Sequence, residues 1–307
     1  MTNYRVVCFI VFIGYVFILI QMVDYVRFEG KGDLLSYELN ASKGAEYYDK
    51  YDNLEISYLA YVKVFFNRSL GLLNSIVLFD LFKVISIIVF SLTYWGFLKK
   101  VNPSYLSLFC FCVVILHPRV FHLFISNYRT GIPLALILFL LSYKASRIYL
   151  LILSFVSLLH TATLFLMLFA LSERIMRNKF HPHVLRFGLI LCFIGLFSFL
   201  VLTGRISGES WNTNMMYAIS TLILFTVYIT CSVLSQSPND NLFLLFSHAC
   251  GFAFVSCILL NISGVRFFGI FLLISSFAIT DWSRDARSLY LVTVTAHCIF
   301  ANYYYFS

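Results

Sequence analysis

Residues 117–172 read HPRVFHLFISNYRTGIPLALILFLLSYKASRIYLLILSFVSLLHTATLFLMLFALS, and this segment decides the class of fold. It holds a Pro-interrupted helical run that carries Arg129, then a hydrophobic run broken at its middle by His160. A charged side chain in lipid costs about 2.5–3.5 kcal/mol or more, so such residues need a polar environment. The segment therefore predicts membrane helices that surround a polar cavity.

The composition extends this prediction to the whole chain. Hydrophobic residues make up 61% of the 307 residues, charged residues make up 12%, and the mean hydropathy is +0.87. Repeated apolar runs of this kind are typical of a polytopic membrane protein with an all-α fold. The net charge of +8 comes from basic residues scattered among the runs, which favours a role in membrane orientation over nucleic-acid binding.

No cofactor or metal is expected from the sequence motifs. The eight cysteines lack the spacing of zinc or redox sites and are interpreted as small buried hydrophobes. The chain contains no GxxxxGK, GxGxxG or HExxH pattern, so soluble-type nucleotide or zinc chemistry has no support.

The apolar runs and their basic flanks predict one integral membrane domain over residues 1–307, with an outer-side loop at about 24–55. The first run has no small-residue cleavage site after it and is expected to stay as a span. With the amino terminus inside, nine crossings are predicted: Val6–Val23, Asn74–Leu98, Ser104–Leu116 (extendable through Phe121), Ile132–Tyr143, Leu185–Leu202, Met215–Leu234, Leu242–Leu260, Phe267–Ile279 and Leu289–Tyr305.

Two further apolar runs do not fit a simple crossing. Ile56–Phe66 is too short to span and is expected to be an interfacial or partly inserted helix. Tyr149–Leu171 is long enough, but basic residues flank both of its ends. We expect a re-entrant hairpin with His160 at its tip, the alternative being one span with a weakened charge rule.

Three arginines, Arg119, Arg129 and Arg266, lie against apolar helices on the predicted outer side. Because this side is poor in positive charge, such arginines need anionic partners. A guanidinium fork matches phosphate oxygens, which favours a lipid-linked phosphate or pyrophosphate. The alternative is pairing with acids such as Asp33 or Glu55 that holds helices together.

Three residues are candidates for a general base, and the residues alone leave the choice open. Asp33 and Glu55 flank the tyrosine-rich outer segment, and His160 has an ordinary pKa close to neutrality. The alternatives are solvated loop acids and a helix-packing histidine. Asp80 and Lys83 lie three residues apart within a span and are predicted to pair with each other.

Several motifs in order resemble those of the EpsG-type branch of bacterial polysaccharide polymerases, which are similar to Wzy O-antigen polymerases. VRFEGKGDLLSYE, residues 26–38, resembles an Arg-x-x-Gly-x-Asp-x-x-x-Tyr start through Arg27, Asp33 and Tyr37. Glu55 heads an apolar helix as in the family, although Ile56 and Ser57 replace its Pro and Gly. The remaining matches are Asn127 and Arg129, His160, and Arg266 in GVRFFGIF, so the resemblance covers roughly residues 5–280.

The resemblance implies a GT-C-like membrane glycosyltransferase that joins undecaprenyl-pyrophosphate-linked repeat units at the periplasmic or outer face of the bacterial inner membrane. It implies no required metal, with the lipid bilayer, a chain-length regulator and a flippase of the same pathway as further partners. An O-antigen ligase and a lipid-linked glycan flippase are the alternatives. The expected roles are pyrophosphate binding by Arg129 and Arg266 with Arg27 and Arg119 as helpers, proton abstraction by His160 or Glu55, and sugar positioning by Asp33.

Overall fold

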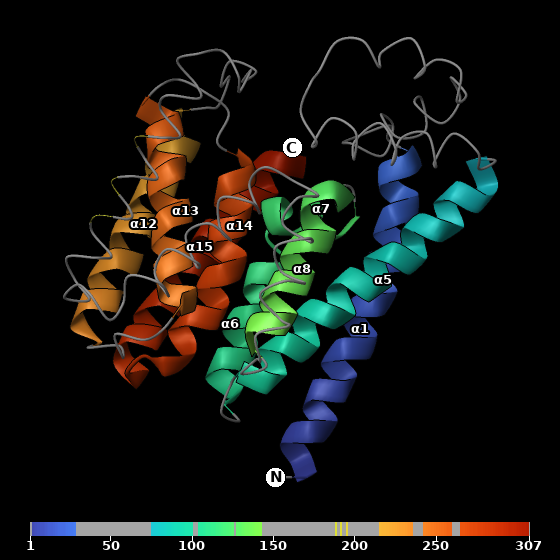
Figure 1. Ribbon diagram of the computed structural model, residues 1–307, viewed down its shortest axis with the longest axis horizontal. Coiled ribbons are helices and arrows are strands. Elements are labelled where there is room, and N and C mark those ends of the chain that lie inside the picture. The colour runs from blue at the N-terminus through green and yellow to red at the C-terminus, as the bar shows by residue number, and fades with distance from the viewer. Residues whose placement is uncertain are drawn as a thin grey trace. The chain divides into compact units, whose positions relative to one another are not determined.

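The computed structural model describes residues 2–28, 75–100, 104–125, 127–142, 215–235, 242–259 and 265–306, with single positions 188, 191 and 195. Every element in this described part is a helix, so the all-α prediction is confirmed for it (Figure 1). The helices are α1 Thr2–Phe28, α5 Ser75–Lys100, α6 Tyr105–Ile115, α7 Pro118–Ile125, α8 Tyr128–Ser142, α12 Met215–Leu234, α13 Leu242–Leu259, α14 Val265–Ala278 and α15 Arg284–Phe306, with a 3-10 turn, η1, at Ile279–Asp281.

Three helices of the described part are long and apolar enough to cross a membrane: α1, α5 and α12. A fourth candidate is the pair α6 and α7, which bends by 75° at Leu116 and His117. These helices identify the chain as a helical membrane protein. The predicted hairpin at Tyr149–Leu171, the helix at Ile56–Phe66 and nearly all of the crossing at Leu185–Leu202 lie outside the described residues.

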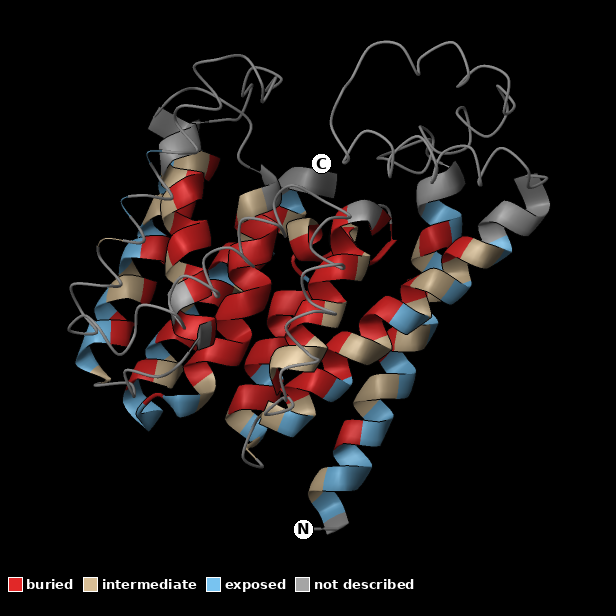
Figure 2. Ribbon diagram, in the orientation of Figure 1, coloured by how far each residue is buried: buried red, intermediate tan, exposed pale blue. Residues whose placement is uncertain are grey.

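The surface of these helices suits lipid. Phe9 and Phe17 of α1 and Val292 of α15 are each more than 60% exposed, and Figure 2 shows exposed residues along both helices. Threonine hydroxyl groups donate hydrogen bonds to backbone carbonyls of their own helix. Thr226 Oγ1 donates to Leu222 O at 2.8 Å, and Thr293 Oγ1 donates to Leu289 O at 2.9 Å. Since lipid offers no hydrogen bonds, polar groups at membrane depth need such internal partners.

The contacts divide the chain into two compact units, described separately here. Unit 1 comprises Met1–Lys99 and His122–Leu164, and unit 2 comprises Lys100–Phe121 and Phe165–Ser307. In unit 1, Phe90 of α5 stacks on Phe12 and Tyr15 of α1 at centroid distances of 5.8 and 5.6 Å. Gly96 lets α5 approach the backbone of α8, because a Cβ there would lie 2.9 Å from Phe139 Cα.

The ion pair of Lys83 in unit 1 differs from the predicted one. Its Nζ lies 2.7 Å from the Asp24 carboxylate of α1, whereas Asp80 is exposed, so the predicted pairing of Lys83 with Asp80 is wrong. Packing of α1 along α5 places a second carboxylate within reach of Lys83. An ion pair between helices holds the end of α1 against α5, which a pair within α5 would not do.

In unit 2, α14 packs against α13 and α6, while α15 packs against α12 and α6. All residues of α14 from Phe268 to Ala278 are buried, which makes this helix the core of the unit (Figure 2). Its aromatic side chains pack edge-on against neighbours, as in Phe271 against Phe225 at 5.4 Å and against Tyr228 at 5.1 Å.

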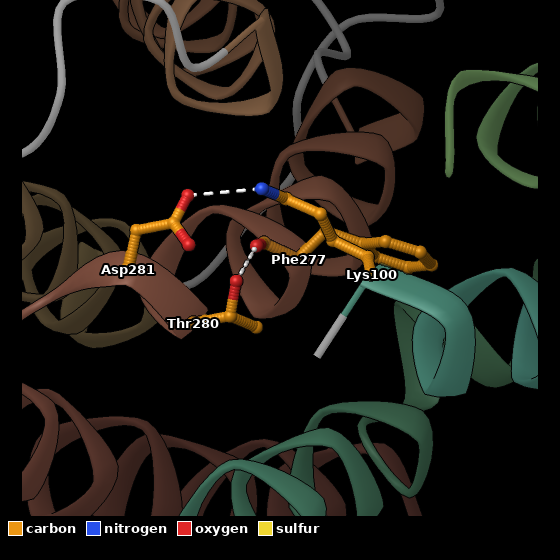
Figure 3. Close-up of polar contacts among 4 residues, drawn as sticks. All are labelled: Lys100, Phe277, Thr280 and Asp281. Atoms are coloured by element: carbon orange, nitrogen blue, oxygen red, sulfur yellow. Dashed lines mark hydrogen bonds and ion pairs between the residues drawn. The ribbon is translucent and has the colours of Figure 1, made fainter. Parts of the chain in front are cut away.

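An ion pair between Lys100 and Asp281 lies at one end of unit 2. Lys100 Nζ lies 3.0 Å from the Asp281 carboxylate of η1 and also lies over the Phe243 ring at 5.9 Å. Figure 3 shows this pair beside Thr280, whose hydroxyl donates to Phe277 O at 2.9 Å. At the same end, Arg287 Nη1 donates to Ser107 Oγ at 3.2 Å.

Replacing Asp281 by asparagine should lower stability only slightly. Lys100 and Asp281 are about a quarter to a third exposed, and such pairs contribute about 0–1 kcal/mol. Thermal unfolding of the purified protein in detergent would measure the change. The charge-swapped variant Lys100→Asp with Asp281→Lys should recover most of the loss, and a loss of several kcal/mol in Asp281→Asn would contradict the expectation.

Candidate functional site

The bend between α6 and α7 organises one end of unit 2. Pro118 cannot donate a hydrogen bond, so α6 ends before it and α7 begins at it, a favoured position for proline. His117 precedes this proline and acts as the N-cap of α7, because its Nδ1 accepts from the Arg119 backbone N–H at 3.2 Å. The carbonyl of His117 accepts from the N–H groups of Val120 and Phe121.

Two carbonyls near the end of α6 receive hydrogen bonds from α15. Cys298 Sγ donates to Val113 O at 3.5 Å, and Asn302 Nδ2 donates to Leu116 O at 3.3 Å. A bend in a membrane helix exposes carbonyls that lipid cannot satisfy. Side chains of α15 therefore stabilise the bend.

Arg119 lies one residue after this proline and is in contact with three parts of unit 2. Its backbone N–H is bound by His117. Its guanidinium charge is close enough to the Tyr217 hydroxyl, at the start of α12, to interact with it electrostatically. Its carbonyl oxygen packs against Gly269 of α14, where a Cβ would lie only 2.7 Å away. Arg119 is thus fixed through its backbone N–H and its carbonyl.

A pair of buried histidines lies beside Arg119. The rings of His117 and His297 stack with centroids 5.3 Å apart and an interplanar angle of 10°, and they are 0% and 4% exposed. Phe268 packs edge-on against both rings, and Tyr217 tilts against His297 at 5.6 Å. Residues from α12, α14, α15 and the α6–α7 bend therefore meet at this cluster.

The histidine nitrogens have unusual surroundings. His117 Nδ1 is an acceptor, so neutral His117 carries its proton on Nε2, and this atom has no hydrogen-bond partner within the described residues. Both nitrogens of His297 are in the same situation there. A buried polar atom that stays unsatisfied costs about 1–3 kcal/mol, which sets these nitrogens apart from the other polar groups of the cluster.

Arg266 is brought to the same end of unit 2. It is the second residue of α14, and positions 266 and 269 lie one turn apart on the same face of the helix. Gly269 contacts the carbonyl of Arg119, so the two arginine positions converge. Both carboxylates of unit 2 that the described helices carry, Asp281 and Asp285, lie at the other end of α14 and α15.

Unit 1 carries the other two predicted arginine positions, 27 and 129. Arg27 lies in the last turn of α1, one turn beyond Asp24, which pairs with Lys83 of α5. Arg129 lies in the first turn of α8, next to Tyr128, whose ring stacks on Phe82 of α5 at 5.1 Å. Asp24 and Tyr128, which lie near these two positions in sequence, therefore contact adjacent residues of α5.

The local structure around Arg129 is tightly specified. The Tyr128 hydroxyl lies 2.9 Å from Ser86 Oγ, and Thr130 Oγ1 donates to Asn127 Oδ1 at 2.9 Å. Gly131 lies against the end of α7, because a Cβ there would come within 1.9 Å of Leu123 O. These contacts fix the backbone at the start of α8.

The predicted site residues Asp33, Glu55 and His160 lie outside the described residues and stay predictions. The sequence analysis assigned no role to His117, Tyr217 or His297. A signal for His117 was present, since a residue with a side-chain acceptor directly before a proline is typical of a helix start. No group of three or more metal-ligating side chains occurs among the described residues.

Comparisons with known proteins identify no relative of this chain. No protein-family model, curated protein or solved structure matches the chain.

Proposed function

We propose that the chain is a polysaccharide repeat-unit polymerase, a glycosyltransferase of the Wzy type with a GT-C-like fold. It acts on undecaprenyl-pyrophosphate-linked oligosaccharides at the periplasmic or outer face of the bacterial inner membrane. In the reaction, a hydroxyl oxygen of the incoming unit bonds to the anomeric carbon of the growing glycan. The bond from that carbon to the lipid pyrophosphate breaks, the pyrophosphate leaves with the electron pair, and a general base takes the hydroxyl proton.

One observation carries the proposal. Arg119 and Arg266, two arginines that the sequence analysis connects with pyrophosphate, lie at the same end of unit 2, where Gly269 contacts the Arg119 carbonyl. The leaving group of this reaction gains negative charge, and fixed cations stabilise such charge most when they need no rearrangement.

The remaining roles follow the motif resemblance. Arg27 and Arg129 contribute to pyrophosphate binding, His160 or Glu55 takes the acceptor proton, and Asp33 positions a sugar hydroxyl.

Deleting the gene and separating surface polysaccharide on a gel tests the proposal. A ladder that collapses to a single repeat on its acceptor, and that returns with the wild-type gene, is the expected result. Loss of surface glycan with full-length polymer retained on the lipid carrier would instead assign a ligase. Single repeat units trapped at the inner face would assign a flippase, and either result would overturn the proposal.

A further inference from the structure

Two buried hydrogen-bond donors at the start of α15 have no acceptor within the described residues. They are the indole Nε1–H of Trp282, a residue that is 3% exposed, and the Nε–H of Arg287. Neither side chain can accept a hydrogen bond, so only an acceptor group can satisfy them. Buried donors without an acceptor are rare in folded proteins. Two of them five positions apart indicate that this end of unit 2 binds an acceptor from outside the described helices.

The packing of Tyr290 brings the two donors to one place. Tyr290 lies three positions after Arg287, one turn further along the same face of α15. The Trp282 ring packs against the Tyr290 ring with centroids 5.9 Å apart and against the Tyr228 ring of α12 at 5.0 Å. Trp282 and Arg287 are therefore both neighbours of Tyr290.

The guanidinium of Arg287 lies where a cation needs a compensating anion. Arg287 is the fourth residue of α15, and its Nη1 donates at 3.2 Å to Ser107 Oγ in the first turn of α6. The N-terminus of a helix carries a partial positive charge, so a guanidinium beside two such ends is unfavourable on its own. A phosphate oxygen beside it would interact favourably with both helix ends and with the guanidinium.

The carboxylates of this end do not supply that anion. Asp281 pairs with Lys100, as Figure 3 shows. Asp285 is exposed, and no carboxylate of the described helices forms an ion pair with Arg287. The charge of Arg287 is therefore compensated neither by its own helix nor by a neighbouring one.

We infer that Arg287 and Trp282 form a binding site for a phosphate group, and that Ser107 holds the guanidinium in place. The oxygens of a phosphate accept from several donors at once, and the guanidinium fork matches two of them. The helix α5 is long and apolar enough to span a membrane and ends at Lys100, the partner of Asp281, so this end lies near the lipid headgroups. An anionic phospholipid is therefore one source of the phosphate, and a soluble phosphate is the other.

This site is separate from the one in the proposed function. Arg119 lies beside His297, ten positions after Arg287 and nearly three turns further along α15. The inference therefore does not depend on whether the chain is a polymerase.

The indole N–H of Trp282 reports directly on the site. The chain has three tryptophans, so a nitrogen-15 spectrum of the purified full chain in a neutral detergent contains three indole signals. Trp282→Phe assigns one of them, because that signal alone disappears. The titrants are dihexanoyl-phosphatidylglycerol, inorganic phosphate, and dihexanoylglycerol as the lipid without phosphate. We expect the Trp282 signal to shift to saturation with the phosphatidylglycerol and not to shift with dihexanoylglycerol.

Two variants test the arginine. Arg287→Gln should weaken the affinity for the phosphatidylglycerol by about tenfold, the effect of losing one hydrogen bond to a charged group. Arg284→Gln is the matched control, because it removes the same charge from an exposed residue three positions earlier in α15, and it should bind as the wild type does. The thermal unfolding temperature of each variant is recorded beside its affinity.

The three titrants and two variants give distinct outcomes. Saturation by the phosphatidylglycerol alone supports the site and assigns a lipid headgroup, whereas saturation by inorganic phosphate as well supports it and assigns a free phosphate. A Trp282 signal that none of the titrants shifts, or that dihexanoylglycerol shifts equally, would overturn the site. Equal affinities of Arg287→Gln and the wild type, or equal losses in Arg284→Gln and Arg287→Gln, would overturn it too.

Discussion

Gly131→Ala should destabilise unit 1 by about 3 kcal/mol, at the upper end of what overpacking costs. The added methyl carbon would lie 1.9 Å from the Leu123 carbonyl oxygen and 3.1 Å from its carbonyl carbon. These are backbone atoms of α7, so no rotamer change of a side chain can relieve the clash. The start of α8 must move, and the Tyr128 and Thr130 contacts around Arg129 are lost with it.

Gly14→Ala is the matched control for this experiment. The site on α1 has no heavy atom within 4 Å of an added Cβ, and alanine forms helices better than glycine by about 1 kcal/mol. Thermal unfolding in detergent should therefore show opposite signs for the same substitution at the two positions. A Gly131→Ala protein as stable as the wild type would contradict the close approach of α7 and α8.

Replacing the pyrophosphate arginines should have the largest effect on activity. Arg119→Ala, Arg129→Ala and Arg266→Ala should each reduce polymer by at least about a hundredfold, as loss of one charge-stabilising group does in other enzymes. Lysine at these positions should restore only part of the activity, because it keeps the charge without the planar fork. Polymer length on a gel and membrane protein level by immunoblot are the two readouts.

Arg284→Ala is the control for charge removal. Arg284 is exposed and begins α15 at the end of unit 2 opposite to Arg119, so its loss should leave polymer unchanged. Wild-type polymer from Arg129→Ala or Arg266→Ala, with normal protein levels, would remove that residue from the pyrophosphate site.

The long apolar helices were predictable from the sequence. Met215–Leu234 matches α12 at both ends, and Asn74–Leu98 matches α5 within two residues, because a continuous apolar run of about 20 residues specifies its own limits. The bend at His117 was not predicted. The apolar run continues through Phe121 and conceals the break, although Pro118 marks it.

Contacts between helices were the part that the sequence could not provide. The predicted partner of Lys83 was the nearest acid on its own helix, whereas the actual partner, Asp24, lies on another. The stacking of His117 on His297 depends on which helices are neighbours, and hydrophobic periodicity carries no information about that. The candidate arginines could be selected from the sequence because a charge within an apolar run is visible without any knowledge of packing.

The bend between α6 and α7 also sets an order of events during biosynthesis. Its carbonyls at Val113 and Leu116 are satisfied by Cys298 and Asn302, which lie 185 and 186 residues later in the chain. At about 5–20 residues per second, a ribosome needs roughly ten to forty seconds to make that stretch. Until α15 is inserted, the carbonyls of Val113 and Leu116 must have other hydrogen-bond donors. The end of unit 2 that carries Arg119 therefore reaches its final hydrogen bonding only after α15 has been made.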